Sequence, residues 1–248
     1  MKEKTTVESS DNKKPDLPGV GFIGLGRMGR SMAMNLSRSS HDCLLSVYDI
    51  REGQMDGFED NNHCRKAPSA NAAAEGNDVV ITVLPGPAQI DQVVLSADGV
   101  LDQMSPGSVL MDLSTVLPET TDALAKAASE RGCHFVDAPI GRLAEHADRG
   151  ESLFMVGADE AVFERVKPLL STMGNTIHHC GGPGTGTRTK LINNFLAIVS
   201  CQMNAECLAL SQYFGLDLSK TLEVIHGTSA TNGPVSYTHL TLPTIYTV

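Results

Sequence analysis

Residues 20–37 read V-G-F-I-G-L-G-R-M-G-R-S-M-A-M-N-L-S and join a short apolar strand to a helix through a G-x-G-x-x-G turn. In such a turn, Gly24 permits the tight bend and Gly26 lets the backbone approach a pyrophosphate. Gly29 allows the helix to pack close to the strand, and the helix N-terminus faces the anion. A glycine-rich turn without a ligand is the alternative, but the strand before it and the helix after it favour a dinucleotide site.

Asp49 supports the same interpretation, because it closes the next predicted strand, Leu44–Tyr48, twenty residues after Gly29. An acidic side chain at that position can accept hydrogen bonds from both ribose hydroxyls of NAD and would repel the 2′-phosphate of NADP. Arg51 follows two residues later and could pair with that phosphate, so NADP stays open as an alternative. We expect NAD as the cofactor.

Further short apolar runs, each followed by a helix or a loop, continue this pattern. The predicted strands are Val20–Ile23, Val79–Leu84, Val109–Leu113, Phe135–Ala138, Leu153–Val156 and Thr176–His179. The run at 79–84 lacks polar alternation, as expected of a strand covered on both faces of a parallel sheet. The alternation predicts a doubly wound, mostly parallel α/β Rossmann domain over residues 19–183, after a polar arm at 1–18 that we expect to be disordered.

The pattern becomes helical after the glycine-rich segment 181–186. Apolar residues recur every four positions at Leu191, Phe195, Val199 and Met203. This spacing predicts one long helix over about 187–214, and the next apolar stretch predicts a second over 218–225. Residues 184–234 are therefore expected to begin an all-α domain.

Residues 235–248, V-S-Y-T-H-L-T-L-P-T-I-Y-T-V, lack the helical period. They resemble the translated read-through of a common sequencing adapter, so we interpret them as a non-native tail that leaves the helical domain truncated. A strand-like tail is the alternative. A truncated domain would expose apolar surface on the long helix, and we would then expect this chain to be weakly active or inactive.

Charge and composition exclude several classes of function. The formal net charge is −10 and no stretch is rich in Lys or Arg, which argues against nucleic-acid and membrane-surface partners. No apolar run approaches the roughly 18 residues that span a bilayer, and the polar N-terminus does not fit a secretory signal. The six cysteines and the histidines lack metal-ligand spacing, so we expect no metal and a cytoplasmic protein with reduced thiols.

Lys190 and Asn194 lie four residues apart, and therefore on one face of the long helix. A lysine beside a cofactor cleft can protonate a carbonyl oxygen as hydride reaches the carbon, if burial lowers its pKa towards neutrality. An asparagine on the same face can hold that oxygen. The spacing alone is explained at least as well by a surface lysine and an exposed amide.

Four segments in order resemble the signature motifs of the β-hydroxyacid dehydrogenase family, which includes 3-hydroxyisobutyrate dehydrogenases and tartronate semialdehyde reductases. They are G-F-I-G-L-G-R-M-G-R-S-M-A-M-N-L (21–36), D-L-S-T (112–115), F-V-D-A-P (135–139) and G-T-G-T-R-T-K-L-I-N-N (184–194). The resemblance covers about residues 19–233 and implies a Rossmann domain joined by a long helix to an all-α domain. We expect the full-length form to be a homo-oligomer that associates through the helical domain.

The resemblance implies roles for individual residues. Lys190 would be the catalytic acid/base, and Asn194 its helper on the substrate oxygen. The cofactor-binding residues that it implies are Gly24, Leu25, Gly26, Arg27, Met28, Gly29, Asp49, Leu84, Pro85 and Thr115. Ser114 is expected beside Thr115, in contact with the substrate. The alternative reading of both residues is a cap for the helix that begins near Pro118, and the two roles can hold together.

One segment, Ala138-Pro139-Ile140-Gly141-Arg142, departs from the family, which commonly has Ser-Gly-Gly after the apolar residue. The guanidinium of Arg142 suits a carboxylate or a sulfonate. This variant resembles the 3-sulfolactaldehyde reductases, which implies that Arg142 and Asn193, beside Gly141, clamp a sulfonate while Lys190 serves the aldehyde. A solvent-facing Arg142 is the alternative. Asp137 is expected to order the turn next to this substrate loop.

These features predict NAD-dependent reduction of a small anionic aldehyde, with 3-sulfolactaldehyde favoured and 2,3-dihydroxypropane-1-sulfonate as the product. Oxidoreductases of 3-hydroxyisobutyrate, tartronate semialdehyde or succinic semialdehyde stay open. So does a non-catalytic dinucleotide-binding module, although the presence of Lys190 argues against it. The family usually carries a further lysine in a K-D-L segment, which this sequence lacks.

Overall fold

The computed structural model describes residues 19–39, 43–58 and 63–235. These residues form two units, divided between Thr187 and Arg188. The predicted arm at 1–18, and the predicted tail apart from Val235, lie outside the described residues.

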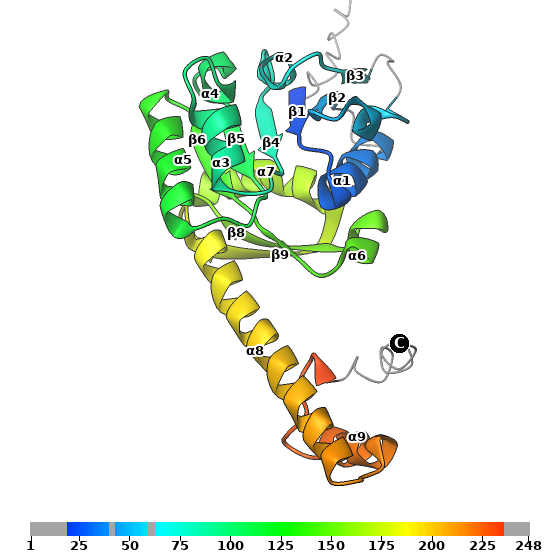
Figure 1. The fold of residues 1–248 in the computed structure, drawn as a ribbon. Helices are drawn as coiled ribbons and strands as arrows, with labels where there is room; N and C mark the ends of the chain where they lie inside the picture. The colour runs from blue at the N-terminus through cyan, green and yellow to red at the C-terminus, as the bar shows by residue number, and fades with distance from the viewer. Residues whose placement is uncertain (1–18, 40–42, 59–62, 236–248) are drawn as a thin grey trace, which may run out of the picture. The chain divides into compact units, whose positions relative to one another are not determined.

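Within the described residues, the first unit is built on a nine-stranded sheet in the order β3-β2-β1-β4-β5-β6-β8-β7, with β9 paired to β8 (Figure 1). The strands are β1 (Gly19–Ile23), β2 (Leu44–Tyr48), β3 (Cys64–Lys66), β4 (Val79–Thr82), β5 (Val109–Asp112), β6 (His134–Asp137), β7 (Ile140–Gly141), β8 (Ser152–Gly157) and β9 (Gly174–Gly181). Neighbours among β1 to β6 run parallel, while β8 runs antiparallel to β6 and β7 and parallel to β9. The prediction of a mostly parallel sheet is confirmed.

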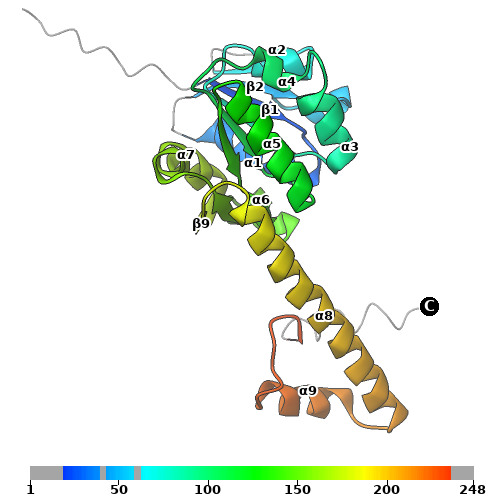
Figure 2. The same ribbon diagram turned by 90° about the vertical axis from the view of Figure 1, so that its left-hand side faces the viewer.

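Helices cover both faces of this sheet (Figures 1 and 2). They are α1 (Arg27–Arg38), α2 (Ala70–Ala74), α3 (Pro87–Ile90), α4 (Val100–Gln103), α5 (Pro118–Glu130), α6 (Ala144–Asp148) and α7 (Glu160–Met173), with short helical turns η1 (Glu52–Met55) and η2 (Asp91–Leu95). Successive residues of β1 enter different cores, because Phe22 packs with residues of α1 and α7 whereas Ile23 packs with residues of α2, α4 and α5. Burial on both faces explains why the central strands are apolar throughout.

Two short strands escape the sequence prediction. In β3, Arg65 and Lys66 are exposed at the edge of the sheet, so this strand has no apolar run. In β7, only two residues pair with β8, directly after Pro139. Neither strand is long enough to show a period.

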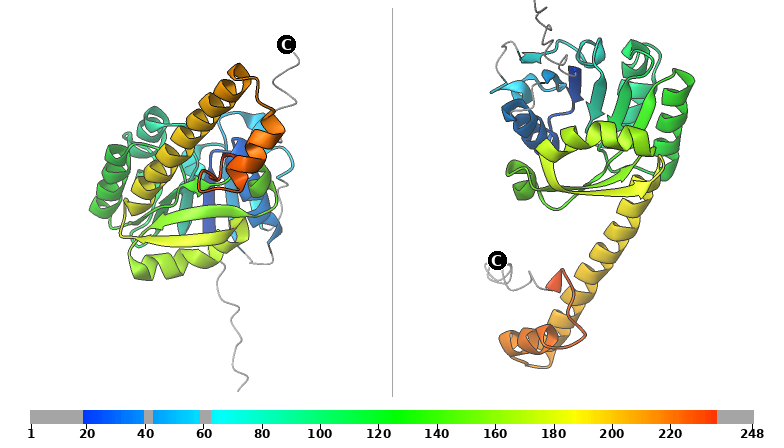
Figure 3. Two further views of the ribbon diagram at one scale, coloured as in Figure 1. Left: turned by 90° about the horizontal axis from the view of Figure 1, so that it is seen from below. Right: turned by 180° about the vertical axis from the view of Figure 1, so that it is seen from behind.

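The second unit contains most of α8 (Thr185–Tyr213) and all of α9 (Leu218–His226), coloured yellow to orange in Figure 3. Both helices are confirmed, and Gly215, at φ +69°, follows the end of α8 as a left-handed cap. The apolar spacing on α8 does not mark a buried face, because Phe195 is 68% exposed and Met203 is 54% exposed. Among the helices of the described residues, none combines the length and apolar character that crossing a bilayer requires.

Candidate functional site

The loop from Gly24 to Gly29 joins β1 to α1 at the carboxyl ends of the parallel strands. Gly24 has φ +97°, and a side chain there would collide with the carbonyl oxygen of Val83. A side chain at Gly29 would collide with the carbonyl oxygen of Gly24. At Gly26, nothing lies within 4 Å of where a Cβ would stand. The loop therefore packs tightly at both ends and leaves backbone open in the middle, which is the geometry that a pyrophosphate needs.

Asp49 follows β2 and is connected directly to this loop. Its Oδ2 accepts the backbone N–H of Leu25 at 2.7 Å, and its Oδ1 accepts that of Arg51 at 2.9 Å. The guanidinium Nε of Arg51 lies 3.6 Å from the same Oδ1. Asp49 also lines a cavity of about 510 Å³ together with residues of β2, β3 and η1.

Arg27 opens α1 and lines a cavity of about 620 Å³ together with Gly26. Its guanidinium pairs with Asp148 of α6 at 3.0 Å, and the hydroxyl of Ser31 donates to the same carboxylate. The side chain is thereby held by the protein, and Met28 beside it is half-buried.

The D-L-S-T turn ties the carboxyl ends of β4 and β5 together. The buried hydroxyl of Ser114 donates to Asp112 Oδ1 at 2.6 Å and accepts the N–H of Leu84 at 2.9 Å. Thr115 is exposed beside it, and Pro85 is exposed after β4. Thr115 is therefore the better placed of the two hydroxyl residues to meet a ligand, since the hydroxyl of Ser114 already has protein partners.

The alternative role of this turn as a helix cap is wrong. The N-cap residue of α5 is Leu117, and its side chain makes no capping hydrogen bond. One residue, Val116, separates Thr115 from Leu117. The hydroxyl of Ser114 instead accepts the N–H of Leu84, which follows β4.

Asp112 is an almost fully buried acid at this edge of the sheet. Burial raises the pKa of Asp112 to about 6, although hydrogen bonds from Ser114 and Thr82 favour the ionised form. The hydroxyl of Thr82 donates to Oδ1 at 2.7 Å. A buried carboxyl group with a raised pKa is therefore hydrogen-bonded to Ser114.

The substrate loop after β6 has an unusual backbone at Arg142. This residue adopts φ +69°, a left-handed conformation that a side chain disfavours. Its guanidinium donates to the carbonyl oxygen of Glu151 at 2.7 Å, to Asn175 Oδ1 at 2.8 Å and to Thr176 Oγ1 at 3.0 Å. Gly141, just before it, is buried against Leu153. The guanidinium is thus held against β8 and β9, and an anion bound there would share it with these oxygens.

Asp137 has a role that the sequence does not reveal. Its carboxylate is buried and accepts backbone N–H groups at the start of α8. No motif signals this contact, because the partner residues lie 47 and 50 positions further along the chain.

Lys190, Asn193 and Asn194 belong to the part of α8 in the second unit. Lys190 and Asn194 are half-buried on one face, whereas Asn193 is exposed. Burial lowers the pKa of Lys190 below its usual range. A lysine shifted in this direction gives up its proton more readily, as a general acid must.

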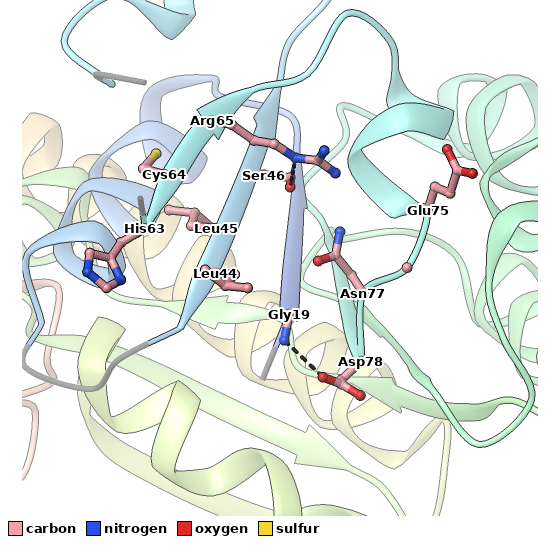
Figure 4. A pocket seen from close by; sticks show the side chains of 11 residues that line it. Gly19, Leu44, Leu45, Ser46, His63, Cys64, Arg65, Glu75, Asn77 and Asp78 are labelled. Carbon is pink, nitrogen blue, oxygen red and sulfur yellow. Dashed lines mark hydrogen bonds between the residues drawn. The ribbon is translucent and has the colours of Figure 1, made fainter. Parts of the chain in front are cut away.

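A cavity that the sequence does not indicate lies at the amino ends of β1, β2 and β3, with a volume of about 400 Å³ (Figure 4). At its walls, Arg65 Nε donates to Ser46 Oγ at 2.7 Å, and the N–H of Gly19 donates to Asp78 at 2.9 Å. Ligands of doubly wound sheets bind at the carboxyl ends of the strands, so we assign this cavity no part in cofactor binding. In the described part of the chain, no three His, Cys, Asp or Glu side chains gather as metal ligands would.

Comparison with known proteins gives two family matches that together span most of the chain. A family model described as the NAD binding domain of 6-phosphogluconate dehydrogenase matches residues 19–182. A second, described as "NAD-binding of NADP-dependent 3-hydroxyisobutyrate dehydrogenase", matches residues 184–241.

Individual relatives agree with these matches. The chain is 36% identical to the NAD-dependent L-serine dehydrogenase of Pseudomonas aeruginosa, over 86% of this chain and 70% of that protein. It is 33% identical to the 3-sulfolactaldehyde reductase of Escherichia coli, over 88% of this chain and 72% of that protein. Among solved structures, the 3-hydroxyisobutyrate dehydrogenase of Mycobacterium tuberculosis with L-serine matches with a TM-score of 0.78 and 28% identity, over 88% of this chain and 76% of that one.

Proposed function

The chain belongs to the β-hydroxyacid dehydrogenase family, and from that premise we propose that it uses NADH to reduce a small anionic aldehyde, with 3-sulfolactaldehyde favoured. It is an NAD(P)-dependent oxidoreductase with a nicotinamide dinucleotide cofactor. The observation that carries the proposal is the open glycine loop at Gly26, joined through Leu25 to the carboxylate of Asp49.

NAD is the proposed form of the cofactor because of what surrounds Asp49. A carboxylate there accepts hydrogen bonds from ribose hydroxyls and repels a 2′-phosphate. Arg51, the residue that could counter this repulsion, lies against the same carboxylate, 3.6 Å from Oδ1. To bind the 2′-phosphate of NADP, Arg51 would have to leave the carboxylate of Asp49. This requirement favours NAD over NADP.

The proposed mechanism uses Lys190 as the acid. When bound, the reduced nicotinamide supplies the hydride to the carbonyl carbon of the aldehyde. Lys190 donates its ammonium proton to the carbonyl oxygen, and the amide of Asn194 donates a hydrogen bond that holds this oxygen. The product is the alcohol, and Lys190 takes up a proton again from water. The lowered pKa of Lys190 supports this role.

The proposed anion site consists of Arg142 and Asn193, with Gly141 and Ser114 beside the substrate. A guanidinium can bind a sulfonate or a carboxylate with two parallel hydrogen bonds. Three protein oxygens already occupy part of the guanidinium of Arg142. The relatives are named for different substrates at similar identity, among them L-serine, 3-sulfolactaldehyde and 3-hydroxyisobutyrate. The competing substrates that the sequence leaves open are 3-hydroxyisobutyrate, tartronate semialdehyde and succinic semialdehyde. We also propose that the full-length form is a cytoplasmic homo-oligomer that associates through its helical domain.

The experiment follows NADH oxidation by the full-length protein with 3-sulfolactaldehyde and with succinic semialdehyde, in the wild type, Arg142→Ala and Lys190→Ala. We expect a strong preference for the sulfonate that Arg142→Ala removes. Lys190→Ala should abolish turnover while NADH still binds. Equal activity on both aldehydes, unaffected by Arg142→Ala, would refute the sulfonate site and leave the family assignment standing.

Cofactor choice is measured separately, by titrating the chain with NADH and NADPH and following the fluorescence of the nucleotide. We expect tighter binding of NADH. Equal affinities would contradict the role given to Asp49, and binding of NADH without turnover of any anionic aldehyde would indicate the non-catalytic module instead.

A further inference from the structure

The start of α8 is held by a carboxylate from the central sheet. Asp137, the last residue of β6, is 1% exposed. Its Oδ1 accepts the N–H of Gly184 at 2.6 Å, and its Oδ2 accepts the N–H of Thr187 at 2.6 Å. The first N–H groups of a helix have no partner inside the helix, and a negative charge there also offsets the positive end of the helix dipole. Asp137 therefore caps α8 from a distant part of the sequence.

Further contacts hold the same turn within the first unit. The hydroxyl of Thr121 in α5 donates to the hydroxyl of Thr187 at 3.1 Å, and both side chains are buried. A side chain at Gly186 would collide with the carbonyl oxygen of Met155 in β8. The first turn of α8 is thus fixed against β6, β8 and α5.

We propose that Asp137 is a positioning residue for proton transfer by Lys190. Lys190 follows Thr187 by three residues in the same helix, so the two side chains leave α8 on neighbouring positions of one face. A first turn that frays or rotates would displace the ammonium group from the carbonyl oxygen that it protonates. This proposal rests on the proposed function, since it requires Lys190 to be the acid.

The test is Asp137→Asn, which keeps the size of the side chain but replaces one acceptor oxygen with an NH₂ donor. One N–H group at the start of α8 then loses its partner. In the full-length protein we expect kcat to fall roughly 10- to 100-fold, because small misplacements of a catalytic group act on the rate. The KM for the aldehyde and the Kd for NADH should change less than about twofold, because a displaced acid alters transition-state rather than ground-state contacts. A kcat within twofold of the wild type would overturn the proposal.

Asp78→Asn is the matched control, because it makes the same change at a carboxylate that accepts one backbone N–H, from Gly19 at 2.9 Å, at the amino end of the sheet. We expect it to leave kcat unchanged. If Asp137→Asn does not fold, Thr187→Val replaces it. That variant removes the hydroxyl that bonds to Thr121 and to the Asp137 carboxylate, and it keeps the N–H bonded to Asp137. Its kcat should fall severalfold at unchanged Kd for NADH, and an unchanged kcat would contradict the proposal.

Amide hydrogen exchange distinguishes the effect of Asp137 on the start of α8 from an effect on proton transfer by Lys190. In this chain, Asp137→Asn should speed exchange of the amides of Gly184 and Thr187, while exchange in the loop from Gly24 to Gly29 stays as in the wild type. If Lys190→Ala retains full turnover, the proposed function of Lys190 fails, and the positioning role fails with it. If Lys190→Ala abolishes turnover but Asp137→Asn leaves kcat intact despite faster exchange, only the positioning role fails.

Discussion

The sheet of the first unit and the long helix α8 both follow regular apolar patterns, but they bury their apolar residues very differently. Phe22 in β1 is fully buried, whereas Phe195 in α8 is 68% exposed. In the first unit, helices on both faces of the sheet supply the covering surface. In the described part of the second unit, the buried apolar cluster consists of Leu208, Leu222 and Val235. A periodic pattern therefore predicts the element, while burial depends on the surfaces around it.

The largest expected effect tests this contrast directly. Phe22→Ala should lower the free energy of unfolding by about 3–5 kcal/mol, because it leaves a cavity in a closely packed core. Phe195→Ala should change it by less than about 0.5 kcal/mol, as expected of an exposed side chain. Urea unfolding followed by circular dichroism measures both values. Should Phe195→Ala prove as destabilising as Phe22→Ala, the exposed face of α8 is covered in solution and the contrast breaks down.

Local chemistry explains which features the sequence predicts well. The glycine loop and Asp49 follow from the constraints of one strand, one turn and one helix, so residues 20–49 contain all the information needed. Helix boundaries on α8 and α9 follow from apolar spacing and from Gly215. Strand β3 is missed because its two charged residues are exposed at an edge, where burial imposes no pattern.

Contacts between distant segments explain what the sequence does not predict. The bond from Thr187 to Asp137 joins residues 50 positions apart, and nothing in either segment indicates its partner. Ser114 is predicted from the sequence to contact the substrate, yet its hydroxyl accepts the N–H of Leu84, 30 positions earlier in the chain. Arg142 is similar, since its partners are Glu151, just before β8, and Asn175 and Thr176 in β9. In each case a side chain with recognisable chemistry has a partner that only the fold supplies.

The second prediction compares the pH dependence of stability at a buried carboxylate, Asp112, with that at an exposed one, Asp102. Burial raises the pKa of Asp112 to about 6, above its value of about 3.8 in the unfolded chain. The folded state therefore binds more protons between these values, and the contribution of Asp112 to stability is lost as pH rises from about 4 to 6. Between pH 7 and pH 4, the wild type should gain up to about 3 kcal/mol relative to Asp112→Asn, from about 1.4 kcal/mol per pKa unit.

Asp102 is the exposed counterpart and should behave in the opposite sense. Its hydrogen bond with Arg131 lowers the pKa of Asp102 below 3.8. A lowered pKa means that this contribution is present above about pH 4 and is lost at lower pH. Urea unfolding of both Asn variants across this range measures the two slopes. A difference between wild type and Asp112→Asn that does not vary with pH would show that Asp112 is more hydrated than its burial indicates.

The smallest expected effect on stability separates two glycines of the same loop. Gly29→Ala places a methyl group against the carbonyl oxygen of Gly24 and should cost about 1–3 kcal/mol, as overpacking does. Gly26→Ala meets no atom within 4 Å, and its φ of −65° suits any residue. We expect the unfolding free energy of Gly26→Ala to stay within about 0.5 kcal/mol of the wild type. Its affinity for NADH should fall at least about tenfold, because the methyl group occupies the space through which the pyrophosphate approaches the backbone. Nucleotide titration alongside urea unfolding distinguishes the two variants. If Gly26→Ala binds NADH as tightly as the wild type, the open space at Gly26 is not where the cofactor approaches. The pyrophosphate-binding role of the loop from Gly24 to Gly29 is then wrong.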